Sequence, residues 1–234
     1  MNDPFSEPAD TREEILGAAY HALCEHGYSD LTIQRIGDEF EKSPSLVYHH
    51  YDGKDELLVD LLGFLLTGFE ETLSAETCET PPRERIDGYV RAMTDPDSID
   101  EHGPNSRFFR ALVELRAQAA HNDAYRGHFD RSDRVFRSFL ERAVRDAAGD
   151  AERRTPVDDT READTRGTDV RTEDTRGDEV RAVPPREVAS TVQTLATGGM
   201  LRWATTSDRE WVEDARNGIH RYLDATLPHV TTEE

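Results

Sequence analysis

The chain has 234 residues, enough for one medium-sized domain or two small ones. It carries 49 acidic and 28 basic residues, for a formal net charge of −21, and Lys42 and Lys54 are its only lysines. The longest apolar run, 57–69, contains Asp60 and is too short for a membrane span of about 20 residues, and two Cys exclude a disulfide scaffold or a Cys-based zinc site. The polar, acidic N-terminus has no signal-peptide pattern, so we expect a cytoplasmic protein.

The acidic excess and the scarcity of Lys are typical of proteins from a salt-rich cytoplasm, such as that of a halophilic archaeon. A charge this large strains a fold through self-repulsion. In multimolar salt the Debye length falls below about 3 Å, and the repulsion is screened. We therefore expect a halophilic source; the alternative is an ordinary acidic protein.

Residues 1–10 are predicted to form a polar arm before the first helix. Thr11 and Glu14 have the spacing of a capping box, which predicts a helix start. Gly27 is expected to end this helix. The residues predicted to share its apolar face are Ile15, Ala18, Ala19, Ala22 and Leu23.

Two short helices follow. Thr32 is a suitable N-cap for the second helix, in which Ile33, Ile36 and Phe40 are expected to point inward. Ser43 and Pro44 are an N-cap and first-turn pair for a third helix, 44–51, which Asp52-Gly53 ends.

The remaining chain predicts longer helices. The fourth, from Lys54 to about residue 74, has a wide face of Leu side chains. Further helices are expected over 82–94, 106–121, 123–148, 187–205 and 208–227. Each Gly inside a helix costs about 0.5–1 kcal/mol, so the small residues 196–199 indicate close approach by another helix. No alternating strand pattern is present, so the fold class is all-α, with about nine helices.

Residues 149–183 differ in composition from the rest. The segment 150–183 contains no Leu, Ile, Phe, Tyr or Trp, and 164–173 and 174–183 are an imperfect ten-residue repeat. A repeat this polar cannot bury a core, so we expect a disordered insertion rich in acids and Arg.

The segment Ser43–Tyr51 contains no acidic residue, although about a fifth of the chain is acidic. Hydroxyl, phenol and imidazole groups can approach phosphates and base edges without charge repulsion. Lys54 follows at a helix N-terminus, where a cation is unfavourable unless it has an anionic partner. A short helix pair with this neutral window predicts a helix-turn-helix that binds DNA.

The run LTIQRIGDEFEKSPSLVYHHYDGKDELL (31–58) resembles the DNA-binding domain of the TetR family of transcriptional regulators. Thr32, the Tyr48–Tyr51 run and Lys54 followed by two Leu fill the family's positions without gaps, and the resemblance covers roughly residues 10–60. It implies a three-helix DNA-binding domain over 11–55 and an all-helical effector-binding and dimerisation domain over 56–148 and 184–228. The last two helices would form the interface of a homodimer.

The resemblance also implies DNA contacts for individual residues. Base edges in the major groove would be contacted by Ser43, Ser45 and His49. The DNA backbone would be contacted by Thr32, Tyr48, His50 and Lys54. Gln34 would face a base or the backbone, and Tyr51 is expected to pack inside.

Two features depart from the family pattern. Gly53 stands where a capping Ser, Asn or Asp is common. Residues 1–54 contain 11 acids and four bases, so counterion release would contribute little to DNA affinity. Shape fit, direct hydrogen bonds and cations that bridge carboxylates to phosphates would have to contribute more.

Other sites are weaker predictions. The nine His lack the neighbouring ligands of a metal site, and no phosphate loop or nucleophile–base motif is present, so neither a metal, a cofactor nor an enzyme is expected. A polar stripe on the helix 106–121 is either the wall of a ligand pocket or a solvated face. The residues predicted to line an effector pocket are Phe64, Tyr89, Phe108, Phe109, Arg110, Glu114, Phe129 and Trp203.

The sequence therefore predicts a homodimeric regulator, acting as a ligand-responsive repressor, that binds a pseudo-palindromic operator in double-stranded DNA. An unknown small molecule would be its effector, and no membrane is involved. The alternative is an acidic helical module that binds a ligand or a partner protein without DNA; the acidity favours it, and the neutral window 43–51 argues against it.

Overall fold

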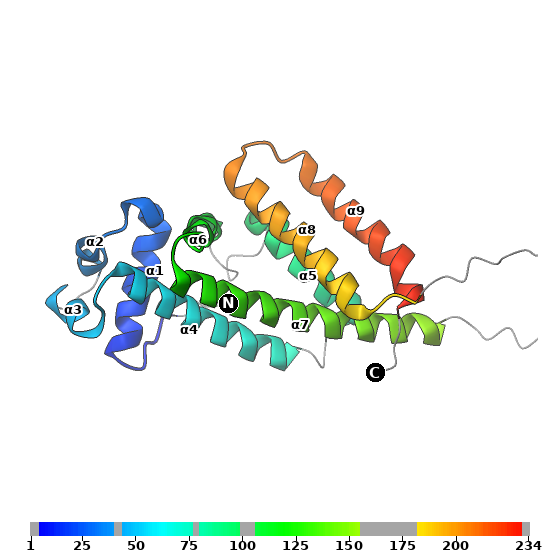
Figure 1. Cartoon of the computed structure of the whole chain (residues 1–234), viewed down its shortest axis with the longest axis horizontal. Helices are drawn as coiled ribbons and strands as arrows, with labels where there is room; N and C mark the ends of the chain where they lie inside the picture. The colour runs from blue at the N-terminus through cyan, green and yellow to red at the C-terminus, as the bar shows by residue number, and fades with distance from the viewer. Residues whose placement is uncertain (1–4, 40–43, 77–79, 99–105, 155–181, 231–234) are drawn as a thin grey trace, which may run out of the picture.

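The computed structural model describes residues 5–39, 44–76, 80–98, 106–154 and 182–230 (Figure 1). Within these ranges the chain forms nine α-helices, and its only strand-like pairing is a single parallel bridge between Val183 and Val230. The all-α prediction is confirmed. The first three helices lie at one end of the molecule, and the last two pack together towards the other (Figure 1).

The N-terminal helices are α1 (Thr11–Asp30), α2 (Ile33–Asp38) and α3 (Val47–His50), the last preceded by a 3₁₀ turn over Pro44–Leu46. Gly27 interrupts α1 with φ 70° and ψ 170°, a combination that is essentially restricted to glycine. The regular part of α1 therefore ends at the predicted residue, and the chain turns there towards α2.

The cap of α1 lies one residue earlier than predicted. Asp10, not Thr11, is the N-cap, and its Oδ1 accepts a hydrogen bond from the Glu13 backbone N at 2.9 Å. Glu13 in turn accepts one from the Ala9 backbone N at 2.8 Å. Asp is at least as good an N-cap as Thr, so the capping arrangement moves to the pair Asp10–Glu13.

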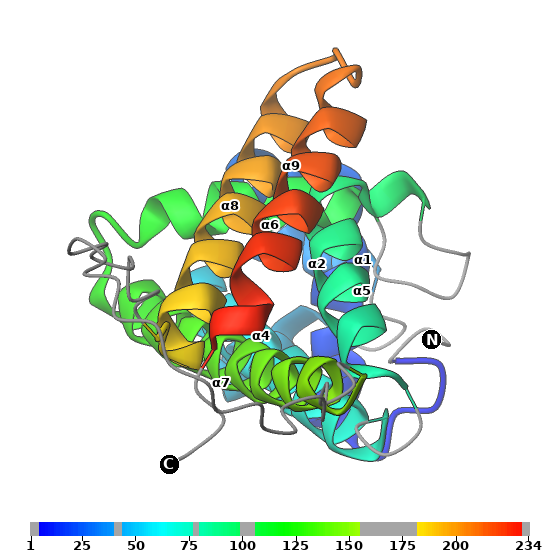
Figure 2. The ribbon, with the colours of Figure 1, turned by 90° about the vertical axis from the view of Figure 1, so that its right-hand side faces the viewer.

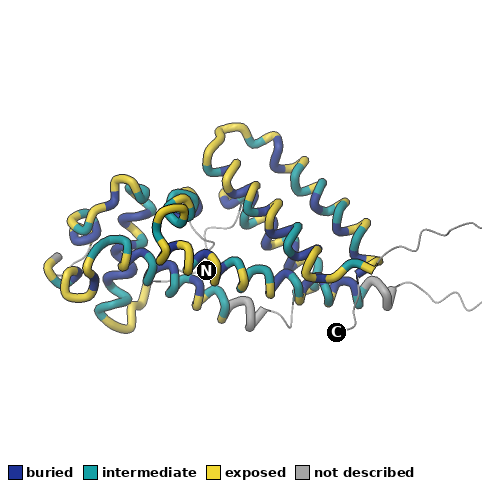
Figure 3. Tube along the Cα trace, in the orientation of Figure 1, coloured by how far each residue is buried: buried dark blue, intermediate teal, exposed yellow. Residues whose placement is uncertain are grey.

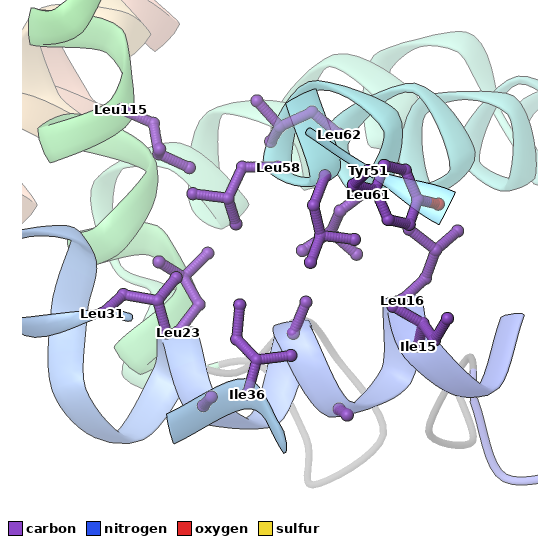
Figure 4. Close-up of a cluster of buried hydrophobic side chains, with 14 of the residues drawn as sticks. Ile15, Leu16, Leu23, Leu31, Ile36, Tyr51, Leu58, Leu61, Leu62 and Leu115 are labelled. Atoms are coloured by element: carbon purple, nitrogen blue, oxygen red, sulfur yellow. The ribbon is translucent and has the colours of Figure 1, made fainter. Parts of the chain in front are cut away.

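The core of the N-terminal part extends into the rest of the chain. Buried apolar residues of α1 meet Ile36 of α2, the Leu side chains of α4 (Lys54–Glu76) and Leu115 of α6 (Ser106–Gln118) (Figure 4). Because one hydrophobic core spans both expected domains, α1 cannot move independently of α4 and α6 without exposing apolar surface.

Phe5 belongs to this core, although the sequence predicted a polar arm here. Its side chain is buried and stacks on Phe64 with ring centroids 5.1 Å apart, and it also contacts Tyr20 at 5.7 Å. A Cβ on Gly17 would lie 2.9 Å from the Phe5 Cβ. The missing side chain at position 17 therefore makes the space that Phe5 fills.

The second part consists of α5 (Pro82–Thr94), α7 (Asp123–Arg154), α8 (Pro185–Thr205) and α9 (Trp211–Thr226), with short 3₁₀ turns after α5 and α9. Helix α8 packs on α5 and α7, and α9 lies along α8 (Figure 2). Helix α7 continues past the predicted end at residue 148 to Arg154. The predicted insertion 149–183 is therefore placed too early, since 149–154 are the last residues of α7; the segment 155–181 lies outside the described residues.

The close helix approach predicted from 196–199 occurs at Gly199. A Cβ at this position would lie 2.6 Å from Thr94 Cγ2 of α5, and Thr94 is fully buried. Gly198 is exposed and has no atom within 4 Å of the equivalent Cβ. Gly199 thus permits the close crossing of α5 and α8, whereas Gly198 does not contribute to it.

Candidate nucleic-acid interface

Helix α3 and the 3₁₀ turn before it expose several of the predicted DNA contacts. Val47 is completely buried and anchors the helix, whereas Ser45, Tyr48, His49 and His50 are exposed, Tyr48 by 63%. The predicted contact Ser43 lies outside the described residues. The result is a surface of neutral polar side chains at one end of the molecule, which suits DNA better than a carboxylate-covered surface would.

Thr32 and Gln34 lie at the start of α2. Thr32 caps this helix, because its Oγ1 accepts a hydrogen bond from the Arg35 backbone N at 3.2 Å. Gln34 Nε2 donates to Asp38 Oδ1 at 3.1 Å. The cap fixes the entry to α2 and satisfies one of the N–H groups of its first turn.

Tyr51 fixes the end of α3, as predicted for a packing residue. It is buried, and its hydroxyl donates to Asp60 Oδ2 at 2.7 Å, while Arg12 Nε donates to the same carboxylate at 2.8 Å. Burial alone would raise the pKa of Asp60, but the hydrogen bonds from Arg12 and Tyr51 outweigh it and hold that pKa below its ordinary value. This network ties α1, α3 and α4 together.

Lys54 has protein partners that the sequence did not reveal. Its Nζ donates to the carbonyl oxygens of Tyr28 and Leu31, both at 3.1 Å, and lies 4.2 Å from the centre of the Tyr28 ring. Its ammonium therefore meets the negative end of α1, which explains a cation at the N-terminus of α4 without a phosphate.

A polar junction connects the end of α1 with helices α4, α6 and α7. Glu114 of α6 accepts a hydrogen bond from the Tyr28 backbone N at 2.8 Å. Asp55 of α4 accepts one from the Tyr28 hydroxyl at 3.1 Å and one from the Tyr125 hydroxyl of α7 at 3.0 Å. Burial and the Asp55 charge raise the pKa of Tyr125, so its proton stays in this bond at all physiological pH values. Spacing in sequence gave no signal for these pairs, because the partners are 27 to 86 residues apart.

The aromatic residues predicted to line an effector pocket belong to three hydrophobic clusters. Phe64, Phe108 and Phe129 belong to the core cluster around α1 and α4, and Tyr89 to the one around α7 and α8. Phe109 and Trp203 lie in a third cluster, with Arg110 stacked on Trp203 at 5.2 Å.

Two cavities open on other residues. One, of about 450 Å³, lies between α5 and α9, and the other, of about 470 Å³, lies beside His50, Tyr51 and Asp60 at the end of α3. None of the eight predicted pocket residues lines either of them.

Among the described residues, no group of three or more His, Cys, Asp or Glu could hold a metal ion. In the same part of the chain, no helix combines the length and apolarity that crossing a membrane requires.

Two family models match the chain. Residues 15–61 match the model of bacterial regulatory proteins of the tetR family, and residues 82–166 match that of the C-terminal domain of BetI-type transcriptional repressors. The first match covers α1 to the start of α4, and the second begins at α5.

Curated proteins and a solved structure that resemble this chain are also named as transcriptional regulators. The regulator BetI of Brucella anthropi is 36% identical over 124 residues, which are 48% of this chain and 64% of BetI. The repressor AcnR of Corynebacterium efficiens is 32% identical over 95 residues, 40% of this chain and 46% of AcnR. The chain thus aligns with less than two thirds of either curated relative. A TetR transcription regulator from Haloarcula marismortui is 30% identical, with a TM-score of 0.67 over 92% of this chain and 97% of that one.

Proposed function

Since the chain belongs to the TetR family of transcriptional regulators, we propose that it binds an operator in double-stranded DNA as a homodimer and regulates transcription in response to a small molecule. The observation that carries the proposal is the exposed, acid-free face of α3 on a chain with a net charge of −21. Each subunit would place α3 in a major groove, and the two-fold axis of the dimer would match a pseudo-palindromic site.

Base edges would be contacted by Ser43, Ser45 and His49, and the DNA backbone by Tyr48 and His50. At the start of α2, Thr32 would contact the backbone, and Gln34 would face a base or the backbone. Lys54 has a different proposed role, because two of its three donors already bind carbonyl oxygens. It would hold the α1–α2 turn against α4 and offer its remaining donor to a phosphate.

The proposed dimer interface is the outward face of α8 and α9. On α8 this face includes Thr194, Leu195, Gly198 and Leu201, with Leu195 exposed by 47% and Leu201 by 52% (Figure 3). Large exposed apolar side chains on an uncharged helical stripe favour burial against a second copy.

The polar junction offers a route for the ligand response. Binding in the second part of the chain would shift α6 or α7, and the bonds of Glu114 and Tyr125 to Tyr28 and Asp55 would transmit that shift to α1 and α4. The ligand would then regulate by favouring a dimer whose α3 helices no longer match the groove spacing.

We further propose that the protein works in a salt-rich cytoplasm. The excess of carboxylates supports this proposal, as does the likeness to a protein of Haloarcula marismortui. Under such conditions DNA affinity would come from hydrogen bonds and shape more than from counterion release.

The test is selection of DNA from a random pool by the purified full chain in molar potassium salt. We expect an enriched inverted repeat. The double variant Tyr48→Ala/His49→Ala should lose this enrichment, because it removes the backbone contact of Tyr48 together with the base-edge contact of His49, and the base-edge contact alone is worth about 1–3 kcal/mol. Sedimentation and circular dichroism should show that dimer and fold persist.

The matched control is His229→Ala, an exposed histidine in the 3₁₀ turn after α9. It should bind DNA like the wild type. If an intact dimer enriches no sequence at any salt concentration, the chain is instead a module that binds a ligand or partner protein.

A further inference from the structure

Polar contacts join α5 to α9 near the start of α5. Near the start of α5, Arg83 Nη2 donates to Asp224 Oδ1 at 2.8 Å, and His220 Nε2 pairs with Asp87 Oδ1 at 3.0 Å. The 450 Å³ cavity lies along α9, beside Asp95, the residue that follows α5. Its lining consists of Asp95, Arg209, Val212, Glu213, Arg216, Asn217 and His220.

Arg216 is the exceptional residue of this cavity. Its guanidinium makes no hydrogen bond or ion pair within the described part of the chain, although acids outnumber bases by 49 to 28. Its Nε is buried and has no partner. A buried, unsatisfied donor costs about 1–3 kcal/mol, so a bound acceptor would remove a real penalty.

Arg209 supplies a second, well-positioned guanidinium in the lining. Its Nη1 donates to the carbonyl oxygens of Thr206 at 2.6 Å and Asp208 at 3.3 Å, and its Cζ lies 5.2 Å from the centre of the Trp203 ring. These contacts fix the side chain through Nη1. Its Nε and Nη2 bind no carboxylate among the described residues. Little side-chain entropy would then be lost when an anion binds.

The lining also limits the charge of a ligand. Guanidinium groups bind carboxylates through paired hydrogen bonds. Asp95 and Glu213, which have no ion-pair partner among the described residues, line the same cavity and would repel a second negative charge. The volume is that of a site for a small organic molecule, and Val212 gives it an apolar wall.

We propose that this cavity binds a small organic monocarboxylate, whose carboxylate group accepts hydrogen bonds from Arg216 and Arg209. The bound molecule would lie against α9, beside Asp95 at the end of α5. The proposal concerns binding and stands independently of DNA recognition by α3.

The chain contains its own reporter for this site. Trp203 and Trp211 are its only tryptophans. Arg209 stacks on Trp203, and Trp211 directly precedes the lining residue Val212. Intrinsic tryptophan fluorescence therefore reports on the cavity without a label.

The experiment is a fluorescence titration of the full chain with sodium propionate and sodium hexanoate at constant ionic strength. We expect a saturable change in emission for the wild type and affinity about tenfold weaker or worse for Arg216→Gln. Arg221→Gln, which removes an exposed arginine from another face of α9, is the matched control and should bind like the wild type.

Sodium sulfate separates a specific site from a general anion effect. A weaker response to sulfate than to propionate supports the proposal. Equal responses that persist in Arg216→Gln would overturn it, as would the absence of saturation with both carboxylates. Circular dichroism of each variant excludes loss of fold as the cause.

Discussion

His128 shows how one side chain couples folding to pH. It lies on α7, where burial and the nearby charges of Arg131 and Arg116 lower its pKa to about 4, with Asp133 opposing them weakly. Between pH 6.5 and 4 the unfolded chain holds a proton here that the folded chain does not. Folding stability must therefore fall as the pH drops through this range.

The variant His128→Gln removes this proton and should lose less stability on acidification than the wild type. Allowing for solvent screening of a partly exposed ring, we expect a difference of about 1 kcal/mol at pH 5. Urea unfolding at pH 7 and pH 5 measures it. The exposed His121 is the control: His121→Gln should keep the wild-type pH dependence, and equal behaviour of both variants would contradict the prediction.

At the residue scale, the sequence was informative where the partner lies nearby along the chain. Thr32 is the predicted cap of α2, and Tyr51 packs as predicted. Lys54 was informative in part: a cation at a helix start does need a partner, but the partner is the end of α1. The Asp55–Tyr125 bond joins residues 70 apart, and no local pattern predicts it.

The crossing of α5 and α8 illustrates packing at the scale of an element. Thr94 is fully buried at the crossing, with its Oγ1 bonded to the Val90 carbonyl at 2.8 Å, so it has little freedom to move away from Gly199. The local cost of a glycine in the middle of α8 is offset by this close contact.

Gly199→Ala should therefore destabilise the fold, although alanine favours helices. Overpacking typically costs about 1–3 kcal/mol, against a gain of about 0.5–1 kcal/mol in helix propensity. Gly88→Ala, on the exposed face of α5 with no atom within 4 Å, should be neutral or stabilising. Urea denaturation measures the free energy of unfolding of both variants. Equal stability would contradict the prediction, because it would mean that α5 and α8 move apart without penalty.

Helix periodicity and caps predicted most element positions, because they depend on neighbouring residues. The third helix was less well predicted, since it begins as a 3₁₀ turn and only 47–50 are α-helical. The effector pocket stays a prediction, because an aromatic side chain that lines a cavity and one that fills a core have the same spacing in the sequence. The α5–α9 cavity depends on the relative positions of helices more than 100 residues apart.

For the whole molecule, the net charge of −21 opposes folding at low salt. Ion pairs such as Arg12–Asp60 stabilise the fold, and added salt weakens them. This loss is expected to be small, because the Arg12 and Asp60 side chains are partly exposed to solvent.

We therefore expect the urea midpoint to rise between about 0.1 M and 1 M KCl, as the Debye length falls from about 10 Å to 3 Å. The triple variant Asp130→Asn/Glu210→Gln/Asp214→Asn, which neutralises exposed acids, should show a smaller rise. A midpoint that falls with salt would show that the ion pairs dominate.

The packing of Phe5 against Gly17 also constrains how this sequence can diverge. An alanine at position 17 would meet the Phe5 side chain, and loss of the aromatic ring would leave a void beside Phe64. The two positions should therefore change together: descendants that retain an aromatic residue at position 5 should retain glycine at 17. Lineages that acquire a larger residue at 17 should be those whose N-terminal arm has been released from the core.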